Sequence, residues 1–143
     1  MNAILFLIVA SSPYPRIEGQ LEGISKNEVA SVYRDMDSIF SRLVICPEQR
    51  YRVVFIRDIT AWKLNQLFPN PLGIVIGNYN RPSRTIWIAT DTGDKVCTLF
   101  HEFVHFKFHT CGLSGIMSND EEHQIIRQME LVYNPSCAAE DGS

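Results

Sequence analysis

The chain has 143 residues, of which 45% are hydrophobic and 20% are charged, and its formal net charge is −3. These values predict a single globular domain, 1–143, and exclude a disordered or fibrous protein. The lysines and arginines form no cluster along the sequence. Because phosphate backbones are bound by concentrated positive charge, nucleic acid is not an expected partner.

An apolar run from Ala3 to Ala10 lies near the start of the chain. It is far too short to span a bilayer, so we expect no membrane partner. We expect residues 1–12 to form a buried strand that ends at the turn containing Pro13 and Pro15. The alternative is the apolar part of a secretory signal, although no Lys or Arg precedes the run.

The cysteines show no CxxC pair and no dense framework; they are Cys46, Cys97, Cys111 and Cys137. A chain of this size can form a core without disulfides. We therefore expect reduced thiols and a cytoplasmic protein, or a secreted one if the apolar run is a signal segment.

The first half of the chain predicts one helix followed by strands. Ser25 and Glu28 have the spacing of a capping box, and the apolar residues behind them recur at helical intervals until Pro47. Residues 51–58 are expected to form a strand, and residues 62–68 a short helical turn. Two apolar runs, 72–79 and 84–90, then predict a hairpin or two adjacent strands.

The second half predicts two helices. The turn sequence DTGD (91–94) leads into a helix that Gly112 and Gly115 would end. A last helix is expected from about Asn119 to Tyr133. The whole order predicts an α+β domain with an N-terminal helix, a small mixed β-sheet and two C-terminal helices.

His101, Glu102 and His105 form an HExxH motif inside the first of these two helices. Residues four apart lie about 40° apart around a helix, so both imidazoles can bind one ion. Glu102 lies about 100° from His101, where a carboxylate can act as general base on a zinc-activated water. The motif predicts a site for one Zn²⁺ ion with Glu102 as the catalytic residue.

His109 continues the four-residue spacing but lies about 12 Å along the helix axis from His101. Since Zn–N bonds are only about 2 Å long, a straight helix cannot bring all three histidines to one ion. We expect His109 to lie at the rim of the site or to be hydrogen-bonded near the end of the helix.

A catalytic zinc needs a third protein ligand, and the helix that starts near Asn119 offers three candidates. Glu121 has the spacing of a capping box with Ser118. Glu122 lies on the apolar stripe, where a carboxylate needs a compensating cation, whereas His123 points away from that stripe. We therefore expect Glu122 to be the third ligand, with Glu121 as the alternative.

With His101, Glu102, His105 and Glu122, the last third of the chain resembles the zincin metallopeptidases, in particular the small gluzincins. TLFHEFVHFKFH also resembles the ImmA/IrrE-type peptidases, and DEEHQIIRQME the compact phage-like zincins. The resemblance implies a zincin-like domain that hydrolyses protein or peptide substrates with one zinc ion. It also implies a strand beside the active-site helix that binds extended substrate, and the sequence RTIWIAT (84–90) is the candidate.

Two alternatives remain open. GIMS (115–118) resembles the Met-turn of the metzincins, with Met117 in the turn and Cys111 or His109 as a ligand. The other alternative is a non-catalytic, zinc-binding regulatory protein. For stabilising the transition state, the candidates are His109, His123 and Tyr133. The sequence makes no prediction of oligomeric state.

Overall fold

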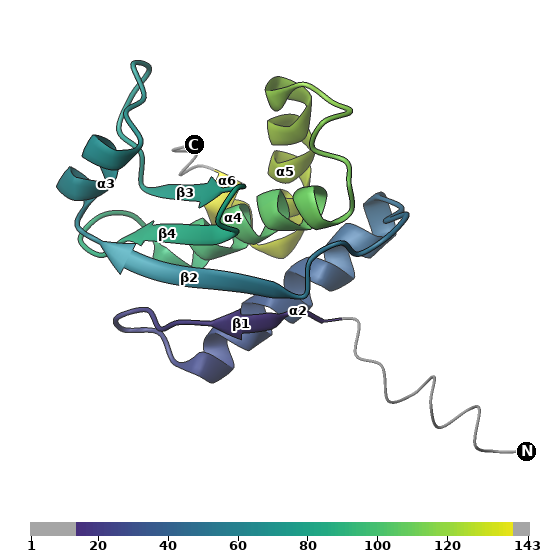
Figure 1. The fold of residues 1–143 in the computed structure, drawn as a ribbon, viewed down its shortest axis with the longest axis horizontal. Helices are drawn as coiled ribbons and strands as arrows, with labels where there is room; N and C mark the ends of the chain where they lie inside the picture. The colour runs from purple at the N-terminus through teal and green to yellow at the C-terminus, as the bar shows by residue number, and fades with distance from the viewer. Residues whose placement is uncertain (1–13, 139–143) are drawn as a thin grey trace, which may run out of the picture.

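A computed structural model describes residues 14–138 and has a mixed α+β fold (Figure 1). Its elements, in chain order, are β1 (Arg16–Glu18), α2 (Lys26–Leu43), β2 (Val53–Ile59), α3 (Ala61–Leu67), β3 (Gly77–Asn80), β4 (Thr85–Ala89), α4 (Lys95–Thr110), α5 (Asn119–Tyr133) and α6 (Pro135–Ala138). The predicted α+β class is confirmed. The strand or signal predicted for residues 1–12 lies outside the described residues.

The four strands form one mixed sheet in the order β1-β2-β4-β3. β1 and β4 both run parallel to β2, and β3 runs antiparallel to β4. β4 is therefore an inner strand, because β2 occupies one of its edges and β3 the other. β3 lies at the end of the sheet, beside α4 (Figure 1).

Helices α2 and α4 cover one face of the sheet and enclose the main core. Ile86 and Ile88 of β4 point into this core, as alternate residues of a strand must. Phe100 and Phe103 contribute fully buried rings from the back of α4. The predicted capping box at Ser25 is present at the start of α2. The apolar residues of the two helices thus hold α4 against the sheet, and no residue of α4 is fully exposed.

Helix α3 packs on the opposite face, at one end of the sheet. Leu64 forms a smaller buried cluster there with Val75 and Ala89. The side chain of Asn65 donates to the carbonyl of Val75 at 2.8 Å and accepts from its amide at 2.7 Å. Because these bonds hold the backbone of Val75 to α3, the strand predicted for 72–79 is shorter than expected and begins at Gly77.

The four cysteines form two disulfides, Cys46–Cys111 and Cys97–Cys137. The prediction of reduced thiols is therefore wrong. Cys97 lies in the first turn of α4 and Cys111 caps its last turn, so both ends of this helix are covalently attached to other parts of the chain. Disulfides persist in oxidising compartments, which argues against the cytoplasmic location expected from the sequence.

Within residues 14–138, no helix combines the length and the apolar character needed to cross a membrane.

Candidate metal centre

Helix α4 presents His101 and His105 on one face, as their spacing predicted. The helix begins at Asp94, whose side chain accepts from the amide of Cys97 at 3.0 Å. Its C-cap is Cys111, and the φ of +75° at the next residue, Gly112, allows the amide of Leu113 to bond back to the carbonyl of Phe108 at 2.9 Å. The imidazole rings of His101 and His105 lie 5.0 Å apart between centroids.

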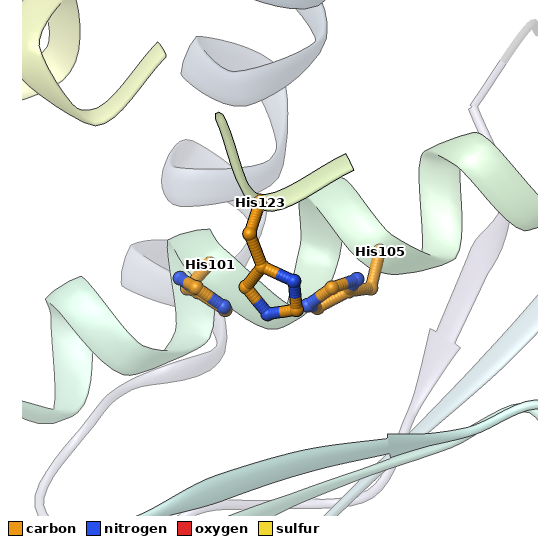
Figure 2. Close-up of side chains that lie close together, drawn as sticks. All are labelled: His101, His105 and His123. Atoms are coloured by element: carbon orange, nitrogen blue, oxygen red, sulfur yellow. The ribbon is translucent and has the colours of Figure 1, made fainter. Parts of the chain in front are cut away.

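Helix α5 brings a third histidine, His123, to the same place. The capping box predicted at Ser118 and Glu121 is present and starts the helix one turn before His123. The ring of His123 lies 5.5 Å from that of His101 and 4.8 Å from that of His105. Figure 2 shows the three side chains converging, two from α4 and one from α5.

The three imidazoles are close enough to share one metal ion. One ring nitrogen from each of His101, His105 and His123 lies within 4.8 Å of the others. Three atoms with that spacing have a common point no more than about 2.8 Å from each, whereas a Zn–N bond is about 2.0–2.1 Å long. A side-chain adjustment below about 1 Å would bring all three nitrogens to bonding distance.

Each of these rings has a hydrogen-bond acceptor at Nδ1. The acceptor is Glu130 Oε2 for His101, at 3.3 Å, and Glu122 Oε1 for His105, at 2.9 Å. For His123 it is the carbonyl of Asn119, at 2.8 Å. The carbonyl of Asn119 only accepts, so Nδ1 of His123 carries the proton in the neutral ring and its lone pair is on Nε2; carboxylate acceptors at His101 and His105 favour the same tautomer. This is the tautomer in which imidazole binds a metal through Nε2.

Glu122, the third ligand expected from the sequence, lies behind His105 and is not one of the three clustered groups. Its side chain is 2% exposed, as a residue on the apolar stripe should be. The ring N–H of His105 compensates Oε1, whereas Oε2 is buried without a hydrogen-bond partner among the described residues, and Arg81 Nη2 lies 3.9 Å from it. The structure therefore brings His123, and not Glu122, together with His101 and His105, and it places Glu122 at Nδ1 of His105.

Glu121, the alternative ligand, is exposed and occupied in the capping box. Bonding to the amide and hydroxyl of Ser118 lowers the pKa of this carboxyl below its ordinary value.

Glu102 is buried beside the three histidines. Its residue is 1% exposed, and it lines a cleft of about 460 Å³ together with His105 and His123. Strand β3 packs directly against it, because Gly77 has no side chain. A Cβ built on Gly77 would lie 2.9 Å from Glu102 Oε2 and would clash with the methyl group of Thr98. Gly77 thus permits the close approach of β3 to the general-base candidate.

His109 lies outside this cluster and contacts β3. Its Nδ1 is 2.7 Å from the hydroxyl of Tyr79, and its ring lies 4.7 Å from that of Tyr51. Burial lowers the pKa of His109, and the nearby positive charges of Arg81 and other arginines lower it further. It is not among the residues that line the cleft.

Three other sequence candidates also have structural roles. Tyr133 stacks on Phe100 with ring centroids 4.2 Å apart. Cys111 is in a disulfide, so the alternative that made it a metal ligand is wrong. Met117 packs against the main core.

The cleft lies along the outer edge of the sheet. It is lined by Phe68, Pro69, Asn70, Pro71, Val75, Gly77, Asn78, Tyr79, Arg81, Glu102, His105, Asn119 and His123. Three of these residues belong to β3, and no strand among residues 14–138 pairs with its outer edge. The prediction that 84–90 pairs with substrate is wrong, because both edges of β4 are already occupied.

Comparisons with protein families, curated proteins and solved structures found no match for this chain.

Proposed function

We propose that this protein is a zinc-dependent metallopeptidase whose ligands are His101, His105 and His123. The observation that carries the proposal is the set of acceptors at the three Nδ1 atoms, which gives every ring the tautomer for metal binding. Three histidines and one open position are typical of catalytic zinc, whereas structural zinc has four protein ligands.

Glu102 is the proposed general base. Zinc, when bound, would lower the pKa of water in its open position and polarise a substrate carbonyl. Glu102 would take the proton of the attacking water and then donate it to the nitrogen of the leaving amine. Its burial in the wall of the cleft supports this role, because a carboxylate shielded from bulk water retains a strong interaction with its reaction partner.

The outer edge of β3 is the proposed binding surface for the substrate backbone. An extended peptide can add to such an edge through main-chain hydrogen bonds, which select for shape more than for sequence. Asn78 and Tyr79 lie on this strand and line the cleft. This arrangement supports a peptide substrate over a small, compact one.

A secreted or otherwise extracytoplasmic location is also proposed. Two disulfides attach α4 to distant parts of the chain, and such bonds form where the environment is oxidising.

A Glu102→Gln variant tests the proposal. The wild type and the variant are both produced with intact disulfides, and the zinc content of each is measured. Each is then incubated with a mixed peptide library, and new termini are counted by mass spectrometry. We expect one zinc per chain in both proteins and a loss of cleavage on the order of 10²-fold or more in the variant. Glu121→Gln is the matched control, because it neutralises an exposed carboxylate while keeping a residue that can form the capping box.

Two outcomes would count against the proposal. Equal cleavage by the wild type and Glu102→Gln would exclude Glu102 as the base. A zinc-loaded wild type that cleaves nothing would favour the non-catalytic, zinc-binding regulatory protein.

A further inference from the structure

Arg81 places a positive charge in the wall of the cleft. It directly follows β3, in the turn that joins β3 to β4. Of the described residues that line the cleft, it is the only Lys or Arg, and His105 and His123 line the same cleft. Any substrate held along β3 would therefore pass close to one guanidinium group.

This guanidinium has capacity for a further partner. Its side chain is 51% exposed, and its one ion-pair contact within residues 14–138 is with Glu122 Oε2, at 3.9 Å. That separation is too long for a hydrogen bond. Arginine carries five N–H donors in a fixed fork that matches the two oxygens of a carboxylate.

The turn that carries Arg81 is well defined. Asn80 Oδ1 accepts from both the amide and the hydroxyl of Ser83, at 3.1 and 2.8 Å. The amide of Arg84 bonds back to the carbonyl of Arg81 at 3.2 Å, with Arg84 at a φ of +52°. The backbone at Arg81 is thus held in place while its long side chain remains accessible from the cleft.

The two ends of the cleft differ in chemistry. Beyond the start of β3, the wall is mainly apolar and contains Phe68, Pro69, Pro71 and Val75 together with Asn70. At the other end of β3, the cleft is lined by Arg81. A substrate lying along β3 would therefore meet an apolar wall at one end and positive charge at the other.

We infer that Arg81 binds a carboxylate of the substrate, so that the preferred substrates are acidic peptides. The inference rests on the proposed peptidase function and deepens it. Arg81 is linked to the metal centre through Glu122 and His105, which keeps it within about four residues of the scissile bond in an extended peptide. The carboxylate is either an Asp or Glu side chain or the free C-terminus.

The binding of peptide hydroxamates tests whether Arg81 binds a substrate carboxylate. This test does not depend on catalysis, because the hydroxamate group binds the zinc directly. The probes are short, capped peptide hydroxamates in which one glutamate is moved through successive positions, each compared with its glutamine counterpart. A second pair differs only in a free or an amidated C-terminus. Dissociation constants are measured by calorimetry on the zinc-loaded wild type, Arg81→Ala, Arg81→Glu and Arg34→Ala. Arg34 is an exposed arginine of α2 outside the cleft.

For the wild type, we expect at least one acidic probe to bind about fivefold more tightly than its neutral counterpart. Arg81→Ala should bring that ratio to about one, Arg81→Glu should reverse it, and Arg34→Ala should leave it unchanged. The pair of probes that shows the difference identifies the carboxylate as side-chain or C-terminal. Because each ratio is taken within one variant, a general change in folding or zinc affinity cancels.

Two failures are distinguishable. If the hydroxamates bind but no acidic probe is preferred, or if the preference survives Arg81→Ala, the inference about Arg81 is overturned and the zinc site stands. If no hydroxamate binds because the protein holds no zinc, the proposed function fails and the inference fails with it.

Discussion

Replacing His123 with alanine should weaken zinc binding far more than replacing Glu122 with glutamine. The two residues are neighbours on α5, but only His123 places a ring nitrogen within 4.8 Å of those of His101 and His105. Glu122 instead accepts from Nδ1 of His105 at 2.9 Å. The pair of variants therefore separates a ligand from a residue that orients one.

The expected losses in zinc affinity differ by roughly an order of magnitude. A zinc site of three or four ligands is worth about 10–16 kcal/mol, so the loss of one ligand should cost roughly 3–5 kcal/mol, which is a few hundredfold to a few thousandfold in affinity. Loss of a carboxylate that orients a histidine ligand typically costs 10–100-fold. We expect Glu130→Gln to fall in the same range as Glu122→Gln, because Glu130 lies 3.3 Å from Nδ1 of His101.

The assay is competition for zinc against a chelator of known affinity. Circular dichroism of each apoprotein checks that the variant is folded. Glu121→Gln serves as the control and should bind zinc like the wild type. If Glu122→Gln abolishes binding while His123→Ala stays within tenfold of the wild type, Glu122 is the ligand and the assignment made from the geometry is wrong.

Three further predictions concern stability. Replacing Cys97 and Cys137 with serine opens a covalent loop with a sequence separation of 40 residues. Urea denaturation should show that the free energy of unfolding falls by about 4 kcal/mol. An unchanged denaturation midpoint would contradict the disulfide. Gly77→Ala should lower the free energy of unfolding by about 1–3 kcal/mol, because its Cβ would lie 2.9 Å from Glu102 Oε2; a fully stable variant would show that β3 does not pack this closely. Because the pKa of His109 is lowered in the folded protein, the unfolded chain binds more protons, and the free energy of unfolding should fall as the pH drops below about 6.5. His109→Gln should remove part of this pH dependence, which urea denaturation at several pH values measures.

Local features of the chain were predictable because helical geometry alone determines them. The spacing of His101, Glu102 and His105 places the two imidazoles on one face and the carboxylate beside them in any α-helix. The helix boundaries followed equally directly from capping residues such as Ser118. His109 lies away from the cluster, as the rise per residue required.

The third histidine of the cluster was harder to predict because its position depends on how α5 crosses α4. Glu122 and His123 differ by about 100° around their helix. The apolar stripe indicated which side faces the core, and Glu122 does lie there, against His105. The histidine cluster lies at the cleft, to one side of the apolar stripe of α5, and His123 is on that side.

Strand order and disulfide pairing also depend on tertiary structure. Two neighbouring strands, 72–79 and 84–90, were visible in the sequence, but their order in the sheet decides which of them has an available edge. The disulfide partners of Cys97 and Cys111 are 40 and 65 residues away, and no local pattern connects them.

The most direct test of the central claim is X-ray absorption spectroscopy at the zinc edge of the wild-type protein, combined with its metal stoichiometry. We expect one zinc per chain with three imidazole nitrogens at about 2.0–2.1 Å and one further light atom in the open position. His123→Ala should remove one of the three imidazoles from the spectrum. A protein that binds no zinc, or a spectrum that keeps three imidazoles in the variant, would contradict the account.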